Sequence, residues 1–226
     1  FLTQAGLAGR DIIYDQNCRY NLIIRKTLEN IIEFFSGDRK DRNFEKFMLY
    51  VKRFWFSNGM HHHYASEKII PDFSREYFVQ LVKQSRPEKL PLPDGENTDL
   101  FLKRIIPIIF DPNVLPKKVN LDADQDMLLN SAVNFYEGVT QKEAEDYYRA
   151  KIRPRARKPI SHGLNSKMMK ENGVLVERVY RAGGLYSSAI KVILEWLVKA
   201  QEFAENDVQK SVIEKLIQYY ETGDLK

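Results

Sequence analysis

The residues best suited to chemistry lie together between residues 53 and 73 of this chain. An aromatic block precedes a Ser57-Asn58-Gly59 turn, and three of the four histidines follow as His61-His62-His63. A basic residue, Lys68, comes shortly after them. Hydrogen-bonding groups this dense, next to apolar side chains, are typical of a surface that faces a substrate.

The histidine run fits a metal site poorly. Ligands on a strand come from alternate residues, so His61 and His63 could share a face, but a third ligand would have to come from far away. His162 is the only other histidine, and no His-Glu-x-x-His pattern occurs. A hydrogen-bonding or solvent-facing loop is therefore the favoured interpretation.

Other catalytic arrangements are absent from the sequence. Cys18 has no histidine near it in sequence, which favours a packed thiol over a nucleophile. The chain has no Gly-x-Ser-x-Gly motif, no Walker loop and no dinucleotide fingerprint. The basic run from Arg149 to Lys158 lacks interleaved aromatic residues, so a solvated connection is favoured there over an anion or nucleic-acid site.

Composition points to an ordinary globular chain without nucleic-acid or membrane partners. Its 226 residues suffice for one large or two small domains, and a net charge of +4 is too small to indicate nucleic acid. No apolar run approaches the roughly 18 residues of a membrane span. The single cysteine excludes an internal disulfide and favours a reducing, cytoplasmic compartment. Because the chain starts at Phe1 and stops just past a helical pattern, we expect a piece of a longer protein, whose missing start could hide a signal peptide.

Hydrophobic periodicity predicts a predominantly helical α+β fold in one domain, residues 1–226. A hairpin is expected over 163–179 around Glu171-Asn172-Gly173, a strand over 128–135, and exposed loops at 85–98 and 149–159. Pro107 is expected to end a helix. The predicted helices are 21–35, 44–56, 74–82, 99–106, 140–149, 186–203 and 207–220.

The last two predicted helices are apolar over more than the roughly 100° that a surface helix needs. Val192, Trp196 and Tyr219 lie off their main apolar stripes. The extra width requires a further partner, so we expect self-association of this chain at high concentration.

Several blocks of this sequence resemble the N-terminal half of dipeptidyl peptidase III, most closely its Bacteroides-type branch. They follow the same order and span nearly the whole chain. The blocks are residues 9–17 (GRDIIYDQN), 56–64 (FSNGMHHHY), 110–113 (FDPN), 138–145 (GVTQKEAE), 162–166 (HGLNS), 183–186 (GGLY), 204–207 (AEND) and 220–225 (YETGDL).

The resemblance implies a two-lobed zinc exopeptidase that releases dipeptides from the N-termini of short peptides. This chain would be most of the lobe built from a β-barrel with helices. The zinc ligands would lie beyond Lys226, so the chain alone would bind no zinc and be inactive, with the zinc-binding lobe as its partner. The candidate peptide contacts are Asn58, Gly59, His61, His63, Tyr64 and Lys68. The alternative is a non-catalytic α+β module that binds a peptide or an anion.

Overall fold

The computed structural model describes residues 1–152 and 159–225, which form two compact units. We call residues 17–120 and 130–133 the helical unit, and residues 1–16, 121–129 and 134 onward the sheet unit. The expected single domain stays a prediction. Within the described ranges, no helix is both long and apolar enough to cross a membrane.

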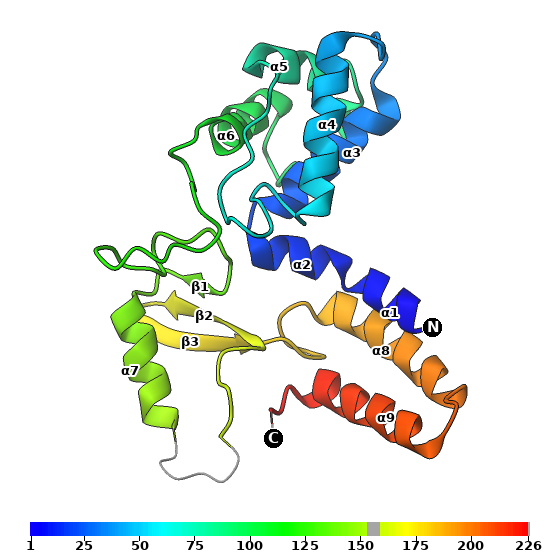
Figure 1. The fold of residues 1–226 in the computed structure, drawn as a ribbon, viewed down its shortest axis with the longest axis vertical. Coiled ribbons are helices and arrows are strands. Elements are labelled where there is room, and N and C mark those ends of the chain that lie inside the picture. Colours follow the sequence, from blue (N-terminus) through cyan, green and yellow to red (C-terminus); the bar gives the residue numbers. More distant parts are fainter. Residues whose placement is uncertain (153–158, 226) are drawn as a thin grey trace. The chain divides into compact units, whose positions relative to one another are not determined.

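The helical unit is built from helices (Figure 1), each of which buries one apolar face. They are α3 (Asn21–Phe34), α4 (Arg42–Phe56), α5 (Arg75–Lys83) and α6 (Thr98–Phe110), with a short 3₁₀ turn, η1 (Pro87–Lys89), before α6. Side-chain caps fix two of the starts: Ser74 Oγ accepts from the Tyr77 amide at 3.1 Å, and Asn97 Oδ1 accepts from the Leu100 amide at 2.9 Å. The apolar faces form a core of fully buried side chains: Ile24, Leu28, Ile31, Phe47, Val51, Phe54, Phe78, Leu81, Phe101, Ile105 and Ile109.

The expectation that Pro107 ends a helix is wrong, because α6 continues through it to Phe110. Proline lacks the amide that would bond one turn back, which weakens a helix interior. Ile105, Ile108 and Ile109 on both sides of Pro107 are buried, and their burial requires the helical path. Hydrophobic burial here outweighs the one missing hydrogen bond.

The sheet unit contains a hairpin of β2 (Ser166–Glu171) and β3 (Val174–Val179), with β1 (Tyr136–Glu137) parallel to β2. The predicted hairpin is confirmed, and its turn residues Asn172 and Gly173 both have positive φ, 50° and 81°. Its helices are α1 (Leu2–Ala8), α2 (Arg10–Asn17), which ends at the boundary of the unit, α7 (Gln141–Lys151), α8 (Ser187–Glu202) and α9 (Asp207–Thr222).

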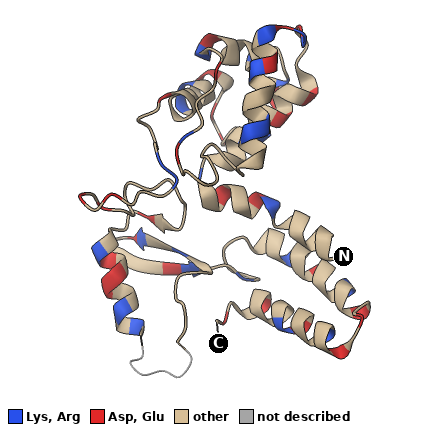
Figure 2. Ribbon diagram, in the orientation of Figure 1, with Lys and Arg blue, Asp and Glu red and all other residues tan. Residues whose placement is uncertain are grey.

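Helix α7 begins with a capping box, in which Thr140 Oγ1 and Glu143 satisfy each other's backbone amides. Along α7, Lys142 is followed by the acidic residues Glu143, Glu145 and Asp146, and the last turn is basic with Arg149 and Lys151 (Figure 2). Ala144 on the apolar side of α7 packs in one buried cluster with Val139, which precedes the helix, and Met168 of the sheet. The expected connection at 149–159 begins as the last turn of α7, and residues 153–158, which carry most of the basic run, lie outside the described residues.

The strand expected at 128–135 is wrong, because most of this segment forms turns before the two-residue β1. Asp126 Oδ1 accepts from the amides of Leu128 and Leu129, both at 3.0 Å. A side chain that takes these amides removes the donors that a ladder would use. The strands in the described ranges form an open three-stranded mixed sheet, so the barrel implied by the resemblance is not seen.

Helix α8 packs against both α1 and α9 in the sheet unit (Figure 1). The buried cluster contains Ala5, Ile193, Leu197, Ala200 and Ile213. Two valines of the predicted apolar face of α9, Val208 and Val212, are instead 75% and 60% exposed. Helix α9 therefore buries only part of its apolar surface within this unit.

Candidate functional site

The candidate segment starts where α4 ends in a tight turn of positive φ. Asn58 has φ of 51° and Gly59 of 144°. A Cβ atom on Gly59 would lie 2.0 Å from Asn21 Nδ2, so only glycine fits this turn. Asn21 Oδ1 accepts from the Met60 amide at 3.2 Å, and Asn17 Nδ2 donates to the Asn58 carbonyl at 3.0 Å. The turn is thereby fixed against the start of α3.

The segment then folds back on itself as a short irregular hairpin. The His62 amide donates to the Glu67 carbonyl at 2.7 Å, and the Ile69 amide donates to the Met60 carbonyl at 2.8 Å. His61 and Lys68 pair as an isolated antiparallel bridge. The hairpin is therefore held by a single bridge and not by a regular strand.

A second segment, residues 111–118, lies against this hairpin and is bonded to it through the backbone. The Lys68 amide donates to the Pro116 carbonyl at 3.1 Å, and the Lys118 amide donates to the Ser66 carbonyl at 2.7 Å. Glu67 and Lys117 form an antiparallel bridge. No local sequence pattern predicts this pairing, because α5 and α6 separate the two segments along the chain.

Two of the predicted contact residues bind the backbone of the second segment with their side chains. His61 Nε2 donates to the Leu115 carbonyl at 2.8 Å. Lys68 Nζ donates to the carbonyls of Asp111 and Val114 at 2.7 and 2.5 Å. His61 is 2% exposed, and Lys68 is half-buried.

Burial sets the protonation of both groups. It lowers the pKa of His61 to about 4, helped by the charges of Lys68 and Lys118 and opposed by the bond to Leu115. Burial also lowers the pKa of Lys68 to about 8, while the charges of Asp111 and Cys18 act in the opposite direction. At pH 7 His61 is therefore neutral, and Lys68 carries an ammonium group.

The tip of the hairpin presents aromatic rings to the solvent. Tyr64 is 87% exposed and Phe56 at the end of α4 is 73% exposed. His63 lies between them, with ring centroids 4.1 Å from Tyr64 and 4.6 Å from Phe56. The His62 ring stacks on His63, and its Nδ1 accepts from the amides of Tyr64 and Ala65 at 3.3 and 3.1 Å, which shapes the tip. Such rings can contact apolar or cationic groups of a ligand.

This segment does not fit a zinc ion. Among the described residues there is no group of three His, Cys, Asp or Glu side chains that could hold a metal. The Nε2 atom of His61 already donates to Leu115. Zinc would need at least three protein ligands, so no catalytic step can be assigned to a metal in this part of the chain.

Sequence reasoning missed a second polar cluster, which lies in the sheet unit around Glu177 of β3. Its carboxylate accepts from Ser166 Oγ at 2.6 Å, Lys151 Nζ at 2.6 Å, Tyr148 at 3.1 Å and Tyr147 at 3.3 Å. Burial raises the pKa of Glu177, but these donors outweigh it and the net pKa is lowered. Because several donors saturate this carboxylate, it joins α7 to the hairpin rather than offering a base for chemistry.

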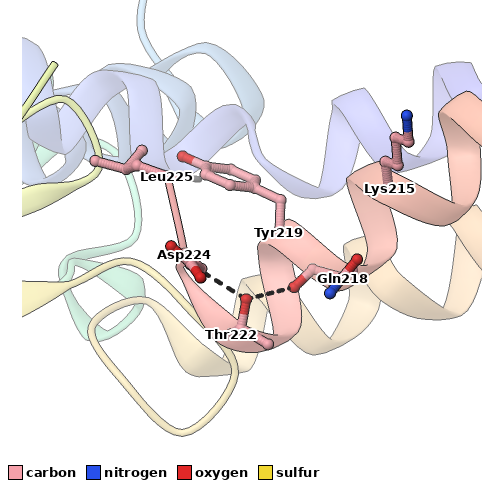
Figure 3. Close-up of a pocket in the computed structure, with 6 residues that line it drawn as sticks. All are labelled: Lys215, Gln218, Tyr219, Thr222, Asp224 and Leu225. Carbon is pink, nitrogen blue, oxygen red and sulfur yellow. Dashed lines mark hydrogen bonds between the residues drawn. The ribbon is translucent and has the colours of Figure 1, made fainter. Parts of the chain in front are cut away.

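A hollow of about 510 Å³ lies at the end of α9 (Figure 3). Lys215, Gln218, Tyr219, Thr222, Asp224 and Leu225 line it. The Thr222 hydroxyl donates to the Gln218 carbonyl and accepts from the Asp224 amide, so it completes the end of the helix. The polar contacts drawn in this hollow belong to the helix terminus and point to no ligand.

Comparison with known protein families finds a match for the second half of the chain. Residues 115–226 match peptidase family M49. This is the dipeptidyl peptidase III family, whose members are zinc-dependent peptidases, so the family predicted from the sequence is confirmed for this part of the chain. No curated protein matches the chain. The candidate segment from Asn58 to Lys68 precedes the matched residues.

Proposed function

We propose that this chain supplies one wall of the substrate cleft of a zinc-dependent dipeptidyl peptidase. The observation that carries the proposal is the match of residues 115–226 to peptidase family M49. The substrates would be short peptides, cut after their second residue. The lobe built around a β-barrel and the Bacteroides-type branch belong to this proposal through the sequence resemblance, and the cytoplasmic location belongs to it through the single cysteine.

Backbone bonds connect the candidate segment to the matched part of the chain. Leu115, Pro116 and Lys118 are among the first matched residues, and they bond to His61, Lys68 and Ser66. A rigid support of this kind is what a surface that positions a peptide needs. This physical link supports extending the family assignment to the segment that precedes the match.

The proposed peptide-facing residues are Asn58, Gly59, His61, His63, Tyr64 and Lys68. Tyr64 offers exposed ring surface and His63 is half-buried beside it, whereas Gly59, His61 and Lys68 hold backbone atoms of their own unit in place. Positioning by such a wall changes rate without supplying a reacting group. Zinc does not fit the described part of this chain. Residues of the peptidase outside that part would hold the metal.

The test uses the complete protein that the gene encodes, loaded with zinc, and a dipeptidyl arylamide substrate. Tyr64→Ala and His63→Ala should each lower kcat/KM about tenfold, a loss of about 1.4 kcal/mol of transition-state binding. Zinc content and melting temperature should stay nearly unchanged, because Tyr64 is 87% exposed. Phe203→Ala, at an aromatic residue that is 69% exposed in the sheet unit, is the matched control and should keep full activity.

Absence of arylamide hydrolysis by the zinc-loaded protein would contradict the proposal. The second candidate is a non-catalytic module that binds a peptide or an anion, and the exposed rings at the tip of the hairpin favour it. It would show binding of a short peptide to the 226-residue chain, lost in Tyr64→Ala, with no hydrolysis by the complete protein.

A further inference from the structure

The segment that follows α6 offers carbonyl oxygens that converge on side chains of the candidate segment. The carbonyls of Asp111 and Val114 both accept from Lys68 Nζ, and the next carbonyl along the chain, that of Leu115, accepts from His61. Residues 111–114 form a turn of their own, because the Val114 amide donates to the Asp111 carbonyl at 3.2 Å. The Asp111 carboxylate supports this turn by accepting from the Asn113 amide at 2.9 Å.

This arrangement is the chemistry of a cation site. Backbone carbonyl oxygens carry partial negative charge, and two of them converging on one ammonium group form charge-assisted hydrogen bonds. A half-buried ammonium group needs such oxygen partners, because burial without them would drive off its proton. Lys68 reaches this place from a distant part of the sequence, so it links two segments that no turn connects.

We infer that Lys68 is a positioning residue: its ammonium group occupies a cation position formed by the carbonyls of Asp111 and Val114, and thereby holds the hairpin that carries His63 and Tyr64. Lys68 acts through the backbone of residues 111–118 and needs no contact with a ligand to do so. The inference deepens the proposed function and rests on it only for the statement that this hairpin faces a peptide.

The strained backbone of Leu115 indicates that the hydrogen bonds of Lys68 stabilise this turn. Leu115 has φ of 52°, a left-handed conformation that costs energy in a residue other than glycine. That conformation accompanies the bond from the Leu115 carbonyl to His61 and directly follows the Val114 carbonyl that Lys68 holds. Without the ammonium group, the strained turn and the hairpin would lose the charge-assisted bonds that keep them together.

The test measures amide hydrogen exchange on the 226-residue chain. Lys68→Met keeps the length of the side chain and removes its charge. The amides of residue 68 and Lys118, which join the two segments, should exchange about tenfold faster or more. Lys117→Met is the matched control: Lys117 is exposed in the same segment and pairs through its backbone, so its exchange pattern should stay that of the unaltered chain.

A chemical rescue tests whether the position is one for a cation. In Lys68→Ala, ammonium chloride should restore slow exchange at the same two amides, and tetramethylammonium chloride at equal ionic strength should not, because it has no N–H to donate. If Lys68→Met does not fold, refolding of Lys68→Ala in ammonium chloride but not in tetramethylammonium chloride supports the inference, and refolding in neither salt overturns it.

The outcomes separate this inference from the proposed function. Unchanged exchange in Lys68→Met, with a raised KM of the complete protein, would overturn the inference and make Lys68 a peptide contact. Faster exchange, in a protein whose unaltered form has no peptidase activity, would support the inference and remove the proposed function.

Discussion

Several residues that the sequence suggests as ligand contacts stabilise the backbone of their own unit in the structure. Gly59 leaves room for Asn21, His61 donates to Leu115, and Lys68 donates to Asp111 and Val114. Residue type and spacing located the segment, because dense hydrogen-bonding groups mark both ligand sites and tight turns. They could not separate the two roles, because the partners lie 39 to 54 positions away in the sequence.

His61 should make the chain sensitive to acid. Its pKa in the folded chain, about 4, lies below the ordinary value of 6.5, so the folded state binds fewer protons between these two values. The stability from neutral His61 is therefore complete above pH 6.5 and is lost as the pH falls toward 4. In the unaltered chain we expect the free energy of unfolding to fall by up to about 3 kcal/mol across this range because His61 is protonated on unfolding. His61→Gln should lack this decrease, as measured by urea unfolding at each pH. His62→Gln, at the exposed neighbour, should keep the pH dependence of the unaltered chain, and an equal effect of both variants would contradict the assignment.

Gly59→Ala should unfold the chain more easily for two reasons that a control can separate. The new Cβ would lie 2.0 Å from Asn21 Nδ2, and φ of 144° is unfavourable for alanine. We expect a loss of more than about 2 kcal/mol in the free energy of unfolding, measured by urea denaturation. Gly95→Ala has positive φ of 79° but open space around it, so it should cost only about 1 kcal/mol. Similar losses in both variants would show that the Asn21 side chain moves aside.

At the scale of elements, local signals predicted helices and turns well and pairings poorly. The predicted Asn172-Gly173 hairpin is encoded within a few residues and is confirmed, and the helix predicted from residue 140 starts at the Thr140 capping box. The predicted helix end at Pro107 is wrong because the burial of neighbouring isoleucines comes from tertiary packing, which a local sequence rule does not describe. The predicted strand at 128–135 is wrong because two of its backbone amides donate hydrogen bonds to the Asp126 carboxylate. The pairing of residues 61–68 with 111–118 had no local signal at all.

Glu177→Gln should weaken the contact between α7 and the hairpin. The carboxylate accepts from Ser166, Lys151 and two tyrosines, and its side chain is 15% exposed. A neutral amide leaves the lysine without its counter-charge. We therefore expect the free energy of unfolding, measured by thermal denaturation, to fall by about 1–3 kcal/mol. Glu171→Gln is the matched control, since its pair with Arg178 is exposed and should contribute less than about 1 kcal/mol. Equal melting temperatures for the two variants would show that the Glu177 cluster does not carry stability.

At the scale of the whole chain, the absence of a three-ligand group in the described residues leads to a prediction about zinc. The tag-free 226-residue chain, dialysed and then analysed for metal, should carry well under one zinc per chain and release no dipeptide. A full equivalent of zinc that is lost in the His61→Ala, His63→Ala double variant would show that the histidine run is a metal site after all.

The sheet unit leaves apolar surface uncovered, which predicts self-association. Ile213 of α9 packs against α8, but Val208 and Val212 are 75% and 60% exposed and lie one turn apart on α9. Contact between two such faces would remove this surface from water, at roughly 25 cal/mol for each Å². Sedimentation velocity over a wide concentration range should therefore show a growing fraction of dimers or larger species. The double variant Val208→Lys, Val212→Glu should stay monomeric with an unchanged melting temperature, because both side chains lie outside the buried cluster. A monomeric unaltered chain at every concentration, with no binding of a hydrophobic dye, would show that this face needs no partner.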